Sequence, residues 1–174
     1  MSSESIKTNS SIEILYNKIL LLSRNKFFFV DMSIKDTFQN KINLIFFHTC
    51  FLFIKVKQKN TDESYKDFYQ KIFDLIFHKI EVNMRELGFG DVTVNKNMKF
   101  LIKIFYNILI NCENYKFKKT DEKEQFLCKY LYDSKALKTI KKSDIIEYFD
   151  KYYSFCLDLT ADKVLKGELN FTYK

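Results

Sequence analysis

The side chains best suited to proton transfer, nucleophilic attack or metal binding are few: two histidines and four cysteines. His48 and His78 each lie in an apolar helical pattern, and neither belongs to a metal-binding or nucleophile–base motif. We therefore interpret both as core or boundary histidines. The cysteines lack the spacing of a metal site and predict buried free thiols in a reducing compartment: Cys50, Cys112, Cys128 and Cys156.

Two further patterns resemble chemical motifs but have simpler interpretations. Gly88 and Gly90 form a lone G-x-G between two helical patterns, without the third glycine of a dinucleotide site or the lysine of a P-loop. They predict a helix cap and a turn. Acidic residues occur mostly beside lysines, as in Lys116–Glu124, which is typical of a solvated charged segment. We therefore expect a protein that binds a partner, with no catalytic centre, cofactor or metal ion.

Composition indicates which elements must position these residues. The 174 residues are 47% hydrophobic and 29% charged, which fits one globular domain. Proline is absent and glycine occurs three times, so the tight turns of sheet-rich folds are disfavoured and an all-α fold is predicted. The net charge is +7, yet only Arg24 and Arg85 are arginine. The lysine excess accompanies an abundance of Asn, Ile, Phe and Tyr, whose codons are also rich in A and T, which is typical of codon bias. Because sites that read DNA bases usually prefer arginine, specific DNA binding is not expected.

The polar residues 1–11 predict a disordered N-terminal tail on a cytoplasmic protein, and residues 12–174 a single compact helical domain. A first helix is expected over Ser11–Arg24, followed by an extended connection over Lys26–Ser33. Asp36 is expected to cap a second helix. That helix is apolar on all sides from Ile42 to Val56, about 22 Å at 1.5 Å per residue. We interpret it as a buried core helix, with a membrane-dipping helix as the alternative.

The clearest amphipathic pattern covers Asp62–Leu87, and Gly88 follows as a C-cap. A fourth helix begins near Thr93, so the short connection predicts a central helical hairpin. After the charged loop at Lys116–Glu124, short helices are expected over Phe126–Tyr132, from a cap at Ser143, and over Ala161–Lys166. The total is about six or seven helices.

The aromatic content is the remaining unusual feature, with 19 Phe and 11 Tyr. One interpretation is an aromatic-rich core that reflects codon bias. The other is an exposed apolar patch or groove, which would mark contact with a protein or a membrane. The sequence pattern leaves both open.

Three stretches, Tyr16–Asp31, Asp36–Val56 and above all Met84–Tyr106, resemble the ubiquinol–cytochrome c chaperone family. Its most specific piece is MRELGxGD followed by a basic helix ending in FY, and the likeness extends loosely to Leu127–Asp133. The resemblance implies an all-helical, non-enzymatic protein that assists assembly of cytochrome b into the ubiquinol–cytochrome c reductase of the respiratory chain. It also implies a bacterial-type member, cytoplasmic and peripheral to the inner membrane. The residues expected to bind the partner are Asp36, Phe38, Arg85, Glu86, Phe89, Asp91, Lys96, Lys99, Lys103 and Tyr106; all of them except Phe89 and Lys103 match the family motif.

We therefore expect an assembly chaperone whose partner is cytochrome b or another respiratory membrane protein, with peripheral contact to a membrane or ribosome. Two alternatives remain: a carrier of a small hydrophobic ligand such as a quinone or lipid, and a ribosome- or RNA-binding protein. A closed, deep cavity would favour the carrier, whereas an open apolar groove or patch would favour the chaperone. Steep salt dependence without need of the aromatic residues would favour RNA binding.

Overall fold

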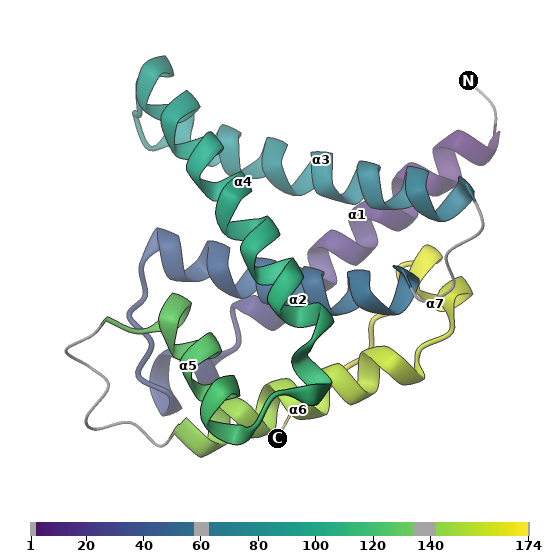
Figure 1. Cartoon of the computed structure of the whole chain (residues 1–174). Helices are drawn as coiled ribbons and strands as arrows, with labels where there is room; N and C mark the ends of the chain where they lie inside the picture. Colours follow the sequence, from purple (N-terminus) through teal and green to yellow (C-terminus); the bar gives the residue numbers. More distant parts are fainter. Residues whose placement is uncertain (1–2, 58–62, 134–141, 174) are drawn as a thin grey trace.

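The computed structural model describes residues 3–57, 63–133 and 142–173 (Figure 1). Within these ranges the chain is all-α, forms a single domain and contains no strand, as predicted. The seven helices are α1 (Ser3–Ser23), α2 (Phe38–Lys57), α3 (Glu63–Glu86), α4 (Asp91–Glu113), α5 (Thr120–Leu131), α6 (Lys142–Asp158) and α7 (Ala161–Leu165).

Helix α2 lies at the centre of the domain, with α1, α4, α5 and α6 packed around it (Figure 1). Every residue from Ile42 to Leu52 is buried, including the polar side chains of Asn43, His48 and Thr49. A helix that is apolar all round is stable only when neighbours cover every side, which is the arrangement here. The prediction of a buried core helix is confirmed. Across the described ranges, no helix has the length and hydropathy needed to cross a bilayer.

Helices α3 and α4 form the predicted hairpin and diverge from a turn at one end of the molecule (Figure 1). Gly88 has φ +86°, and the amide of Phe89 donates to the Met84 carbonyl at 3.1 Å, which closes the end of α3. Gly90 precedes α4 as its N-cap with an ordinary φ of −70°. The left-handed conformation therefore falls on Gly88 alone in this turn.

The first part of the chain differs from the sequence predictions in three places. Helix α1 begins at Ser3 rather than Ser11; the division into an N-terminal tail and a domain stays a prediction. Phe27–Asp31 forms a π-helical turn, η1, where an extended connection was expected, because Phe27 and Phe28 both turn into the core. Thr37 accepts the Asn40 amide at 3.2 Å and so caps α2 in place of Asp36.

The second part differs at two helix starts. Helix α5 begins at Thr120, inside the predicted charged loop, because the Glu122 carboxylate accepts the Lys119 amide at 2.7 Å. Helix α6 begins at Lys142, one residue before the expected cap, and the Ser143 hydroxyl instead donates to Asp144. Helix α7 ends at Leu165, close to the predicted boundary, and Gly167 follows with φ +74°.

Candidate functional site

His48 is a core residue with its ring nitrogens hydrogen-bonded. Nδ1 donates to the Leu44 carbonyl at 2.7 Å, and Nε2 accepts from the Tyr148 hydroxyl at 2.8 Å. Tyr152 donates to the His48 carbonyl at 3.1 Å, which adds a second bond between α2 and α6. Complete burial lowers the pKa of His48 to about 4, so the ring is neutral at pH 7. The geometry is that of a structural link between helices, as the sequence indicated.

His78 and the four cysteines are the other side chains suited to chemistry. His78 is exposed on α3. All four cysteines are buried thiols outside any disulfide, as predicted, and burial raises the pKa of Cys50 and Cys112 well above the thiol value. Among the described residues, no group of three His, Cys, Asp or Glu side chains is arranged to hold a metal ion.

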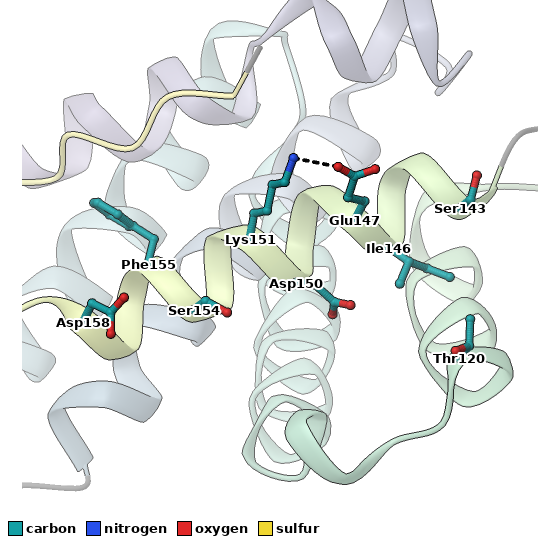
Figure 2. A pocket seen from close by; sticks show the side chains of 9 residues that line it. All are labelled: Thr120, Ser143, Ile146, Glu147, Asp150, Lys151, Ser154, Phe155 and Asp158. Carbon is teal, nitrogen blue, oxygen red and sulfur yellow. Dashed lines mark ion pairs between the residues drawn. The ribbon is translucent and has the colours of Figure 1, made fainter.

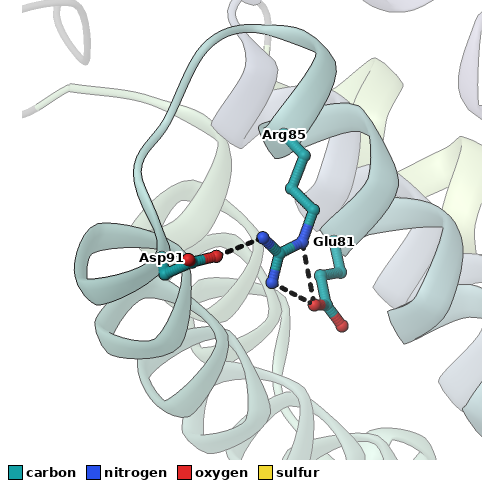
Figure 3. Close-up of polar contacts among 3 residues, drawn as sticks. All are labelled: Glu81, Arg85 and Asp91. Carbon is teal, nitrogen blue, oxygen red and sulfur yellow. Dashed lines mark hydrogen bonds and ion pairs between the residues drawn. The ribbon is translucent and has the colours of Figure 1, made fainter.

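Four of the residues expected to bind the partner lie at the hairpin turn: Arg85, Glu86, Phe89 and Asp91, all exposed. Figure 3 shows the Arg85 guanidinium between Asp91 and Glu81. Its Nη1 donates to Asp91, while Nη2 and Nε donate to one Glu81 oxygen at 2.9 and 3.1 Å. These hydrogen bonds, that to Asp91 foremost, raise the pKa of Arg85. The three side chains fasten the end of α3 to the start of α4, which is an architectural role.

The next four lie together along the exposed side of α4: Lys96, Lys99, Lys103 and Tyr106. Their spacing of three and four residues places them on one face of the helix. The opposite face, which includes Leu101 and Phe105, is buried against the core. The structure thus orients these side chains outwards.

The last two, Asp36 and Phe38, lie at the start of α2, beside a cleft of about 600 Å³. The cleft separates the beginning of α2 from α4 and α5. Lys35 and Asp133 form an ion pair of 2.5 Å among its lining residues. The apolar and aromatic part of the lining comes from Phe100, Ile104, Tyr130 and Tyr132.

Sequence reasoning selected neither Phe100 nor Tyr132 among the binding residues. Both lie within stretches that carry the family resemblance, so their aromatic side chains were the available signal. Of the ten selected residues, the structure brings Asp36 and Phe38 near the cleft and Lys96, Lys99, Lys103 and Tyr106 onto α4 beside it. The hairpin-turn residues form a separate cluster.

A second groove, of about 690 Å³, runs along α6 and reaches the start of α5 (Figure 2). Most of its lining residues are polar or charged by type, and Glu147 and Lys151 are paired at 2.6 Å. Asp150 is bound by Lys123 at 2.8 Å. Only two of its lining residues are apolar, Ile146 and Phe155, whereas the cleft beside α2 has four apolar or aromatic ones, so this groove is the weaker candidate. Both hollows are open at the surface, which favours the chaperone interpretation over a carrier with a closed cavity.

Comparison with known proteins agrees with this architecture. The family model for the Ubiquinol-cytochrome C chaperone matches residues 30–171. The crystal structure of the Cbp3 homolog from Brucella abortus has the same fold, with a TM-score of 0.83 and 18% sequence identity, covering 98% of this chain and 93% of that one. No curated protein matches the chain. Because the family model spans most of the sequence, including the cleft, α4 and the hairpin turn, the chain belongs to the ubiquinol–cytochrome c chaperone family.

Proposed function

We propose that this protein is an assembly chaperone that binds cytochrome b during biogenesis of the ubiquinol–cytochrome c reductase complex. Membership of the chaperone family supports the class of function, and the resemblance of the motif segments implies the client. The protein acts by binding, without a catalytic step, and works at the periphery of the membrane that receives the client.

The observation that carries this proposal is the cleft between α2, α4 and α5. It forms where two of the stretches that resemble the family meet in space, since Thr37 and Phe100 both line it. Phe100 is a large apolar residue that is 56% exposed, and it lines this cleft together with Ile104, Tyr130 and Tyr132, as apolar residues do in binding grooves. An apolar segment of a newly made membrane protein is a fitting occupant, because aromatic and aliphatic side chains would shield it from water.

The polar part of the lining fits the same client. Gln39, Asn40 and Asn107 contribute amide groups to the lining, beside the charged residues Lys35, Lys129 and Asp133. A transmembrane segment ends in backbone and interfacial polar groups, and amides can hydrogen-bond to these without imposing a charge. The cleft therefore offers a partner both apolar contacts and hydrogen-bonding groups.

The test is affinity purification of the tagged protein from its own cells in mild detergent, with mass spectrometry and a haem spectrum. We expect cytochrome b to be enriched over equally abundant membrane proteins. Asn107→Trp should reduce that enrichment several-fold, because the indole would fill the cleft from an exposed position on α4.

Asn95→Trp is the matched control, since Asn95 is also exposed on α4 but does not line the cleft. It should capture cytochrome b as the wild type does. Absence of cytochrome b from the wild-type sample, or equal loss in both tryptophan variants, would contradict the proposal.

A further inference from the structure

One exposed face of α4 carries a continuous row of six side chains, here called the lysine stripe. Successive members are separated by four, three, four, three and four residues, which keeps them on one side of an α-helix. With a rise of 1.5 Å per residue the stripe is about 27 Å long. Its members are Val92, Lys96, Lys99, Lys103, Tyr106 and Ile110.

The stripe lies opposite the buried face of α4, so its side chains point into solvent. Three of the six are large apolar or aromatic residues, with Val92 84%, Tyr106 50% and Ile110 58% exposed. Polar residues normally occupy such a face. The apolar members therefore indicate a surface that is covered when the protein is at work.

The lysine stripe carries positive charge only. No aspartate or glutamate occurs between positions 92 and 112. Within the part of the chain that the structure describes, none of the three lysines forms an ion pair, whereas Lys71 and Lys151 elsewhere pair with carboxylates one helical turn away. The partner must therefore supply both negative charge and a place for apolar side chains.

An anionic lipid bilayer meets both requirements. Lysine ammonium groups bind acidic headgroups, while valine, isoleucine and tyrosine side chains enter the boundary between headgroups and acyl chains. RNA would satisfy the lysines but would leave Val92 and Ile110 exposed to water, and RNA sites usually favour arginine. The combination on α4 therefore favours a membrane surface.

We infer that the lysine stripe docks α4 flat on a membrane rich in anionic lipids. The inference rests on the proposed function for its setting beside a membrane, but it concerns a different surface. Phe100 and Asn107, which line the cleft, lie on the flank of α4 next to the stripe. Docking by the stripe would place the cleft beside the bilayer surface, where a client leaving or entering the membrane could reach it.

The experiment is flotation of the full chain with vesicles of phosphatidylcholine alone or mixed with phosphatidylglycerol. The wild type should bind only the anionic vesicles, and added salt should weaken binding. The triple variant K96Q/K99Q/K103Q should lose about 100-fold in partition coefficient, given roughly fivefold for each lysine. V92S/I110S should also bind more weakly, although it keeps every charge.

The triple variant K79Q/K116Q/K166Q is the matched control, because it removes the same charge from exposed lysines on other elements. It should retain most of the binding. Equal loss in the two triple variants would mean a general charge effect and would overturn the inference. So would a wild type that ignores anionic vesicles but binds ribosomal RNA, or full binding by V92S/I110S.

Capture of cytochrome b in detergent separates this inference from the proposed function. The wild type should both capture the client in detergent and bind anionic vesicles, because the cleft and the lysine stripe are different surfaces. Client capture without vesicle binding by the wild type would overturn the membrane inference alone. Vesicle binding without client capture would overturn the proposed function alone.

Discussion

At the scale of single residues, the imidazole of His48 is a buried polar group with both ring nitrogens hydrogen-bonded. It is fully buried between a carbonyl on its own helix and a tyrosine hydroxyl on α6. Protonation would turn Nε2 from an acceptor into a donor facing a hydroxyl and would place a charge in an aromatic core. The fold therefore depends on the neutral ring.

This dependence predicts a pH profile. Burial lowers the pKa of His48 from 6.5 to about 4, so the unfolded state binds more protons at mildly acidic pH. The contribution is fully present above pH 6.5 and is lost as the pH falls from 6.5 to about 4, by up to roughly 3 kcal/mol. Urea unfolding across that range should show the decline.

His48→Gln should lack this part of the pH dependence, because the amide can donate to Leu44 and accept from Tyr148 without titrating. His78→Gln is the control: the only other histidine is exposed, and its variant should keep the wild-type profile. Identical profiles for wild type and His48→Gln would show that carboxylates alone cause the decline.

At the scale of elements, the α3–α4 turn uses its two glycines differently. Gly88 occupies the left-handed region at φ +86°, whereas Gly90 has an extended conformation that any residue adopts. A Cβ added at either position would meet no atom within 4 Å. Conformation alone therefore distinguishes the two sites.

Gly88→Ala should destabilise the protein by roughly 1–2 kcal/mol through its backbone conformation. Gly90→Ala should cost less than Gly88→Ala, about 0.5–1 kcal/mol, because it loses only the preference for glycine over alanine at an N-cap. Chemical denaturation of the two variants side by side provides the measurement, and equal effects would refute the assignment of the left-handed cap to Gly88.

Periodicity predicted the helices correctly where a helix has one apolar face along its length. The hairpin of α3 and α4 and the burial of α2 followed from periodicity and from the near-absence of glycine and proline. The prediction was wrong where packing overrode the local pattern: the break in periodicity over Lys26–Ser33 suggested an extended segment, yet Phe27 and Phe28 enter the core from a π-helical turn. The sequence analysis also placed the start of α5 at Phe126 instead of Thr120, because the charged residues in the first turn of this helix resemble those of a loop.

The candidate site was only partly accessible to sequence reasoning. Periodicity placed Lys96, Lys99 and Lys103 on the polar side of α4, as the structure has them. The cleft could not be anticipated, because it joins the start of α2 to Tyr132, far along the chain. Only tertiary packing brings those segments together.

At the scale of the whole molecule, the two terminal regions of the chain pack on each other. Gly167, after α7, lies against α1, and α1 and α7 are in contact. A Cβ at Gly167 would lie 2.7 Å from the Ser11 carbonyl oxygen and 3.0 Å from a methyl carbon of Ile14. The close approach requires glycine for space as well as for its φ of +74°.

Gly167→Ala should therefore cost more than Gly88→Ala, roughly 2–4 kcal/mol, because overpacking adds to the backbone effect. Thermal and urea unfolding of the two variants would measure the difference. A Gly167→Ala variant no less stable than Gly88→Ala would mean that α1 and α7 separate freely to relieve the clash.

The bond from Tyr148 to His48 has a consequence for synthesis, since it joins residues 100 positions apart. At about 5–20 residues per second, α2 leaves the ribosome roughly 5–20 s before the part of α6 that covers it. During that interval its phenylalanines lack their native cover, and non-local contacts of this kind slow folding. A protein proposed to shield nascent apolar segments thus exposes an apolar segment of its own while it is being synthesised.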